Sequence, residues 1–357
     1  MSYSKPNNSI NHHLEQNQYE TLTDEFEENS LGLMVLPSES GDQLSEASQL
    51  LYEGIKQQKA GASIAALEAL QKALELFQIV GDVPQQEQAL SVLALASYTL
   101  RDYKNTIAYC QQCLGLVQTT SDLSMKMHLF SLLGNAHRHL KEYKQATKYL
   151  QQCLTITLEM RNERSQVAAL NNLGLVYKAA GKYSKALVYQ KQSLAIVENL
   201  DDNWGMEQVL KNIGNTYYAL HNYPQAIAYY ERCARIARSI KDISSAAQVL
   251  NNLGNACCAT GNYGKAILYF EERLQLAKEM KNTQIEEQSL ASLGLACEAL
   301  GNYKRALKYY EERLFLARKI KNRRGEKQAL ASLKFTYEAL GDYRKAREYE
   351  QDNSGNL

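Results

Sequence analysis

Cysteine and histidine are the residue types in this 357-residue chain that could ligate a metal or carry out redox chemistry. Cys110 and Cys113 form a C-x-x-C arrangement in "YCQQC", and Cys257 is followed directly by another cysteine. A structural zinc site takes four ligands, and no second pair follows at a suitable spacing. His137 and His139, in "HRH", would point to different faces of a helix. These residues therefore predict no metal site and no redox centre.

Other catalytic chemistry requires a nucleophile beside a base, or a glycine-rich loop that cradles phosphate. The sequence contains neither pattern. We therefore expect no enzyme activity, no catalytic residue and no cofactor.

The composition is typical of a folded protein, with 45% hydrophobic and 22% charged residues. A net charge of +1 provides no general attraction to nucleic acid or to an anionic membrane. No apolar run reaches the roughly 18 residues of a membrane-spanning helix, and residues 1–30 lack the apolar core of a signal peptide. The odd number of cysteines, seven, is typical of reduced thiols. We expect a cytoplasmic protein that binds no nucleic acid and does not insert into a membrane.

The elements that would position any binding residues follow a period of 40 residues. Tyrosines recur at this spacing without insertion or deletion, at Tyr103, Tyr143, Tyr183, Tyr223, Tyr263, Tyr303 and Tyr343. A fixed spacing maintained over this length indicates a repeat architecture.

Other residues recur with the same period and predict two helices in each repeat. An aspartate or asparagine is typical of a helix N-cap and begins a first helix of about 17 residues. These residues are Asp82, Asp122, Asn162, Asp202, Asp242, Asn282 and Asn322. A glycine in a left-handed conformation would end this helix at Gly61, Gly181, Gly261, Gly301 and Gly341. Arg101, Lys141 and His221 replace that glycine, so we expect those turns to differ. The second helix begins near the periodic tyrosine.

A further glycine recurs inside the first helix, where glycine costs about 1 kcal/mol relative to alanine. The residues are Gly54, Gly134, Gly174, Gly214, Gly254 and Gly294. We expect each to face the alanine 12 residues later, as Gly254 would face Ala266, so that the two helices approach closely. A leucine at Gly254 should then overpack the crossing at a cost of about 1–3 kcal/mol.

The motifs L-G-x-x-Y and G-x-Y-x-x-A, as in "LGLVYKAAGKYSKA" at 173–186, resemble the tetratricopeptide repeat (TPR). The repeats look like the 40-residue TPRs of LGN/Pins polarity adaptors and of bacterial TPR arrays. The resemblance implies an all-α, right-handed α-solenoid of about eight helix-turn-helix units, whose first helices line a concave groove. The early aromatic residue of the usual motif is leucine here, as at Leu170 and Leu210, and the G-protein-binding tail of LGN is absent.

The chain divides into a tail, the repeats and a short end. Residues 1–42 are acidic and polar, which is typical of disorder. The repeats occupy 43–82, 83–122, 123–162, 163–202, 203–242, 243–282, 283–322 and 323–351, and residues 352–357 form a C-terminal tail.

The family pattern assigns a set of residues to the concave groove, where they would bind a peptide. They are His128, Asn135, Arg138, Asn171, Lys178, Gln208, Lys211, Asn215, Tyr218, Gln248, Asn251, Asn255, Leu295, Glu298 and Phe335. Asparagine donates and accepts hydrogen bonds at once, so a row of asparagines can hold an extended backbone. The alternative is that these amides are ordinary solvated surface.

Charge in this set changes along the chain. Arg138, Lys178 and Lys211 precede the acidic residues Glu298 and Glu338, so a ligand with an acidic and a basic segment would bind in one direction. Lys211, Asn215 and Asn255 also resemble part of the carboxylate clamp of chaperone-binding TPRs. Gln288 and Ser292 stand where that clamp has basic residues, which weakens this resemblance.

The two ends of the chain suggest further interactions. The segment "EFEENSLGLMVLP" at 25–37 is either a chance apolar patch or a pseudo-ligand that occupies the groove. Lys334 replaces the recurring glycine, and the last helix is reduced to about nine residues. We expect that helix to be displaced or frayed, or to dock on another subunit of a homo-oligomer.

The sequence favours a non-enzymatic scaffold or adaptor that binds a peptide segment of a partner protein. The alternative is a peptide-responsive regulator, a signal sensor whose superhelix changes shape on binding and which its N-terminal tail autoinhibits. An RNA-binding repeat protein is disfavoured because the groove carries about as many acidic as basic residues.

Overall fold

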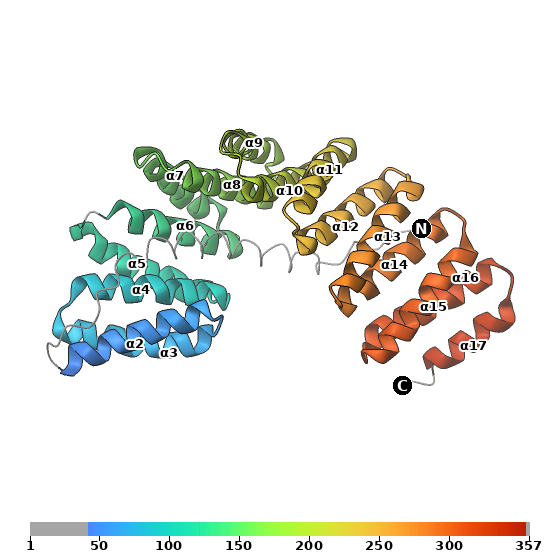
Figure 1. Cartoon of the computed structure of the whole chain (residues 1–357), viewed down its shortest axis with the longest axis horizontal. Helices are drawn as coiled ribbons and strands as arrows, with labels where there is room; N and C mark the ends of the chain where they lie inside the picture. Colours follow the sequence, from blue (N-terminus) through green and yellow to red (C-terminus); the bar gives the residue numbers. More distant parts are fainter. Residues whose placement is uncertain (1–41, 121, 355–357) are drawn as a thin grey trace. The chain divides into compact units, whose positions relative to one another are not determined.

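The computed structural model describes residues 42–120 and 122–354. These contain sixteen α-helices in eight consecutive pairs and no strand (Figure 1). The pairs are α2 (Asp42–Lys59) and α3 (Ser63–Val80), α4 (Val83–Thr99) and α5 (Tyr103–Thr120), α6 (Leu123–His139) and α7 (Tyr143–Glu159), α8 (Glu163–Ala179) and α9 (Tyr183–Asn199), α10 (Asn203–Ala219) and α11 (Tyr223–Ser239), α12 (Ile243–Ala259) and α13 (Tyr263–Glu279), α14 (Thr283–Ala299) and α15 (Tyr303–Lys319), and α16 (Arg323–Ala339) and α17 (Tyr343–Ser354). The all-α class and the helix-turn-helix repeats are confirmed. Of the predicted tail 1–42, residues 1–41, with their segment 25–37, lie outside the described residues, and Asp42 is the first residue of α2.

The helix starts follow the predicted capping residues. Asp82 and Asn162 each accept a hydrogen bond from the backbone N–H three residues later, and the same bond recurs at Asp122, Asp202, Asp242, Asn282 and Asn322. Such a bond satisfies an N–H that has no partner within the helix. The odd-numbered helices from α5 onwards begin at the periodic tyrosine.

The turns within the pairs all use a left-handed residue. Gly181 and Gly261 have φ of 72° and 74°. Arg101, Lys141 and His221, where we expected different turns, adopt φ of 64°, 64° and 58°. These turns thus differ slightly in φ from the glycine turns, whose φ lies between 72° and 80°. The hairpin geometry still imposes the left-handed region, and the side chain accepts the cost of about 1 kcal/mol or more.

The described helices form two compact units, one ending at Ile196 and the other beginning at Val197. In each unit, successive helices pack against one another. Even-numbered helices also contact the next even-numbered helix, as α4 does with α6 in the first unit and α14 does with α16 in the second. Helices α2, α4, α6 and α8 of the first unit therefore lie side by side and form one layer. In the second unit, α14 lies beside α16, and hydrogen bonds join α10 to α12.

The recurring glycine does not serve the close approach to alanine that the sequence suggested. A Cβ at Gly214 would lie 2.5 Å from the ring of Tyr230, and a Cβ at Gly254 would enter the ring of Phe270. In each case the space beside the glycine is occupied by a larger side chain 16 residues later, including Leu70, Leu150, Gln190 and Tyr310. The expectation that alanine is the main partner is wrong, because Ala66 and Ala186 contribute only a backbone oxygen at 3.3–3.4 Å.

The two repeats without the glycine follow the same rule. Ala94 has Cys110 at the corresponding position, and both are fully buried in one core cluster. Lys334 has Glu350 there, and its Nζ lies 2.5 Å from Glu350 Oε1. Helix α17 is 12 residues long, not about nine, and it packs against α16 instead of being displaced.

Candidate functional site

The even-numbered helices carry every residue assigned to the groove, but burial divides these residues into three groups. His128, Asn135 and Lys211 are buried. Leu295 and Phe335 are 59% and 58% exposed. The remaining residues are half-buried: Arg138, Asn171, Lys178, Gln208, Asn215, Tyr218, Gln248, Asn251, Asn255 and Glu298.

The asparagines of the predicted row have different surroundings. Asn135 is 2% exposed, and its Nδ2 donates to the Ser131 carbonyl at 3.1 Å. Asn215 Oδ1 accepts from the Tyr230 hydroxyl at 2.7 Å and from Asn252 Nδ2 at 3.3 Å. Asn251 and Asn255, both on α12, make no side-chain hydrogen bond with another described residue. Asn251 and Asn255 are therefore the asparagines of this row whose side chains keep both donor and acceptor unused among the described residues.

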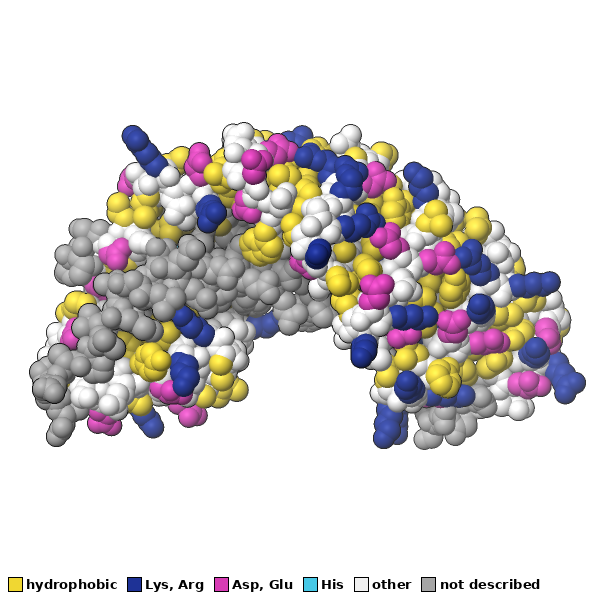
Figure 2. Space-filling model, in the orientation of Figure 1, with side chains coloured by type: hydrophobic (Ala, Val, Ile, Leu, Met, Phe, Trp, Pro, Cys, Tyr) yellow, Lys and Arg dark blue, Asp and Glu magenta, His cyan; other side chains and the backbone are white. Residues whose placement is uncertain are grey.

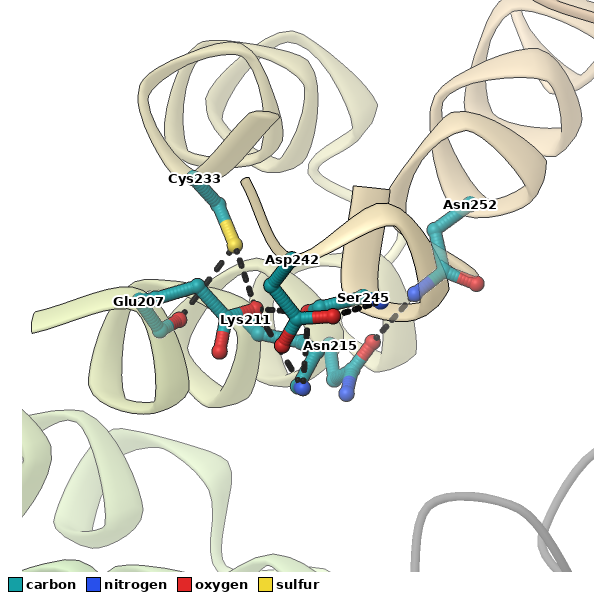
Figure 3. A network of polar contacts seen from close by, with 7 residues as sticks. All are labelled: Glu207, Lys211, Asn215, Cys233, Asp242, Ser245 and Asn252. Carbon is teal, nitrogen blue, oxygen red and sulfur yellow. Dashed lines mark hydrogen bonds and ion pairs between the residues drawn. The ribbon is translucent and has the colours of Figure 1, made fainter. Parts of the chain in front are cut away.

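Lys211 lies in a buried polar network between α10, α11 and α12 (Figure 3). Its Nζ is 3.3 Å from Glu207 Oε1 and 3.4 Å from Ser245 Oγ. Glu207 is fully buried and also accepts from Ser245 Oγ and from Cys233 Sγ. This carboxylate neutralises Lys211 inside the protein, so Lys211 is not available to a ligand in the way that a clamp residue would be.

His128 belongs to the interior as well. Burial lowers its pKa to about 4, although nearby Asp122 acts in the opposite direction. The imidazole is therefore neutral at pH 7 and supplies no positive charge to a ligand.

Two cations occur on neighbouring even-numbered helices of the first unit. Burial and the positive charge of Arg138, on α6, lower the pKa of Lys178, on α8, to about 8. Arg138 donates from Nη2 to His139 Nε2 at 2.9 Å. The mutual repulsion of these cations favours an anionic group near them.

Glu298, an acidic residue that follows these cations in the predicted groove, is hydrogen-bonded within the protein. Glu298 accepts from the Tyr310 hydroxyl and from Thr336 Oγ1, both at 2.9 Å, and so links α14 to α15 and α16. Basic and acidic side chains are interspersed on the face of the second unit seen in Figure 2. The predicted change of charge along the groove stays a prediction, and four of its five residues, Arg138, Lys211, Glu298 and Glu338, are already bonded or ion-paired within the protein.

Two exposed apolar side chains occupy, in later repeats, the position of one of these asparagines. Leu295 on α14 and Phe335 on α16 occupy the position that Asn255 occupies on α12. Helices α14 and α16 contact each other, so the two side chains come from adjacent helices of one layer. Leu175, which occupies the same repeat position on α8, is buried.

The cysteines are packing residues. Burial raises the pKa of the Cys113 thiol to about 12 and that of the Cys258 thiol to about 11, which disfavours the reactive thiolate. Within residues 42–120 and 122–354, no group of three or more His, Cys, Asp or Glu side chains could hold a metal ion. No helix of the same residues is long and apolar enough to cross a bilayer.

Sequence reasoning missed the buried arginines Arg273 and Arg313. They occupy the position at which Cys113, Cys153 and Ser193 serve as small packing residues. The change from a small residue to arginine in this column was the available signal.

Comparison with known sequences identifies the repeat. A profile described as tetratricopeptide repeat matches residues 125–199 and 205–279, and a second profile of that description matches residues 289–324. A comparison with curated proteins found no match.

Three solved structures illustrate the similarity in fold. The apo form of RapI has a TM-score of 0.62 and 15% identity, over 97% of this chain and 96% of that chain. The apo form of the quorum sensor NprR from B. thuringiensis has a TM-score of 0.59 and 16% identity, over 96% and 94%. A Rap protein complexed with Competence and Sporulation Factor has a TM-score of 0.54 and 14% identity, over 98% of both chains.

Proposed function

Because the chain belongs to the tetratricopeptide repeat family, we propose that the exposed side of its even-numbered helices binds a peptide segment of a partner protein. The protein acts as a non-enzymatic scaffold or adaptor in the cytoplasm. The observation that carries this proposal is the combination of Asn251 and Asn255 with Leu295 and Phe335 on successive even-numbered helices of the second unit.

The chemistry of these side chains suits an extended peptide. The amides of Asn251 and Asn255 can each donate to a peptide carbonyl and accept from a peptide N–H. Leu295 and Phe335 offer apolar surface to alternate side chains of the ligand. The half-buried cations Arg138 and Lys178 provide a separate contact for an acidic ligand residue in the first unit.

The test uses 12-residue random peptides displayed on phage, selected on the full chain and then synthesised. We expect Asn251→Ala/Asn255→Ala and Leu295→Ser/Phe335→Ser each to weaken binding about tenfold or more, as loss of central contacts does. Leu268→Ser/Phe315→Ser is the matched control, because these side chains are 65% and 71% exposed on the odd-numbered helices α13 and α15. Equal losses in the control, or failure to select any peptide, would contradict the proposal.

A second candidate is a regulator whose repeats rearrange when a peptide signal binds. It is supported by similar structures described as a quorum sensor and as a complex with Competence and Sporulation Factor. Solution scattering with and without the selected peptide separates the two: a decrease in the radius of gyration supports the regulator, and an unchanged profile supports the scaffold.

A further inference from the structure

The repeats place one residue of the odd-numbered helix against the residue 26 positions earlier on the even-numbered helix of the same pair. In three repeats the later side chain donates to the backbone carbonyl of the earlier residue: Cys113 to Glu87, Ser193 to Val167 and Cys233 to Glu207. In a fourth, Arg313 donates to the Glu287 side chain. The register is thus the same in both compact units and predicts that Arg273 faces Ala247.

Arg313 shows how this position accommodates a buried guanidinium. Its Nε donates to Glu287 Oε1 at 2.6 Å, and its Nη2 donates to Gln328 Oε1 at 2.8 Å. Arg313 and Glu287 are both buried, so the positive charge is neutralised where water is largely excluded. Such pairing is what makes a buried charge tolerable.

Arg273 has only half of this arrangement. Its Nη2 donates to Gln288 Oε1 at 2.9 Å, as Arg313 does to Gln328. Its Nε and Nη1 are buried and have no hydrogen-bond partner. Ala247 stands where the next repeat has Glu287, so this repeat lacks that glutamate. No carboxylate among the described residues bonds to Arg273.

An unpaired guanidinium in this environment is costly. Arg273 is 5% exposed, and burial lowers its pKa to about 10. A planar guanidinium with two nitrogens whose N–H donors are unused matches a carboxylate in geometry and in charge. Its one acceptor, Gln288, is itself exposed on α14, so the guanidinium lies directly beneath a side chain that reaches the surface.

We propose that Arg273 binds a carboxylate of the peptide ligand, in the role that Glu287 performs for Arg313. This inference rests on the proposed function and deepens it, because Ala247 lies one helical turn before Asn251 on α12, and Gln288 lies on α14, which packs against the α13 helix that carries Arg273. The ligand carboxylate is an acidic side chain or the C-terminus of the peptide.

Two variants remove the proposed carboxylate site, one by deleting the guanidinium and the other by pairing it within the protein. Arg273→Ser introduces the residue that the first unit has at Ser193, where it is fully buried. Ala247→Glu supplies an internal carboxylate at the position of Glu287. The control Glu287→Ala/Arg313→Ser removes the paired charges of the next repeat together and so leaves no buried charge unpaired. Circular dichroism and thermal melting establish that each variant is folded.

The measurement is the affinity of the selected peptide, of forms with Asp→Asn or Glu→Gln replacements, and of a C-terminal amide. For the wild type and the control, we expect removal of one carboxylate to weaken binding about tenfold or more. Weaker binding of the C-terminal amide identifies the C-terminus as the ligand carboxylate. Weaker binding after a side-chain replacement identifies an acidic residue. For Arg273→Ser and Ala247→Glu, removal of the same peptide carboxylate should weaken binding less than about twofold. The guanidinium is absent from Arg273→Ser, and in Ala247→Glu it is already paired with the new glutamate.

The outcomes separate this inference from the proposed function. If a peptide binds but its carboxylates contribute equally in the wild type and in both site variants, the carboxylate site is refuted while peptide binding stands. If the carboxylate-dependent contribution disappears in the control as well, Arg273 is not its partner. If no peptide is selected, both proposals fail.

Discussion

The pair Glu207 and Lys211 shows that a charged residue at a position assigned to the groove can belong wholly to the interior. The two are one helical turn apart on α10, and both are at most 2% exposed. Removing one partner of a buried ion pair leaves the other charge without compensation, whereas removing both can be nearly neutral. The pair is therefore a structural unit, and its members should not be judged separately.

We expect Lys211→Met or Glu207→Met alone to cost about 3–5 kcal/mol of unfolding free energy, and the double variant to cost much less. Urea denaturation of the three variants provides the measurement. Lys334→Met is the control, because the Lys334–Glu350 pair is solvent-screened and should contribute little to stability. If the two single variants were as stable as the wild type, Lys211 would not be neutralised internally and could serve a ligand.

Between helices, the recurring pair of glycine and a large side chain 16 residues later sets how each hairpin closes. The space beside Gly254 is filled by the ring of Phe270, which is 1% exposed. A core ring cannot move away without displacing its own neighbours, since protein interiors are closely packed. Ala94 with Cys110, and Lys334 with Glu350, show that the two members of the pair vary together.

Gly254→Ala should therefore destabilise the protein by about 1–3 kcal/mol through overpacking. The same substitution at Gly264, on α13, meets no atom within 4 Å and should stabilise the helix by up to about 1 kcal/mol. Thermal melting of both variants tests this opposite sign. A stabilising Gly254→Ala would show that the helix pair can open without cost.

Across the whole chain, each helix is stabilised mainly by its immediate neighbours, so an end helix has fewer stabilising contacts. In α17, Ala346 is the only buried side chain between Tyr343 and Gln351, whereas α15 buries seven residues, among them Tyr310 and Leu314. Local stability falls where little apolar surface is buried.

Hydrogen exchange should therefore be faster in residues 343–354 than in residues 303–319. Mass spectrometry of peptides from both segments provides the comparison within one sample. Protection of α17 equal to that of α15, and increasing with protein concentration, would contradict the simple end effect and support docking of this helix on a second copy.

The sequence alone determined the helices, their caps, their turns and their pairing into repeats, because these depend on residues within about four positions and on a constant period. It also contains the arginines at 273 and 313, but it does not reveal their state, that is, whether each guanidinium is buried and paired with a carboxylate. That state depends on side chains 15 and 26 residues apart, which only packing brings together. In the same way, tertiary structure decided that Asn135, His128 and Lys211 are interior residues, whereas Asn251 and Asn255 are half-buried and Leu295 and Phe335 are exposed, because burial is a property of the neighbours and not of the residue itself.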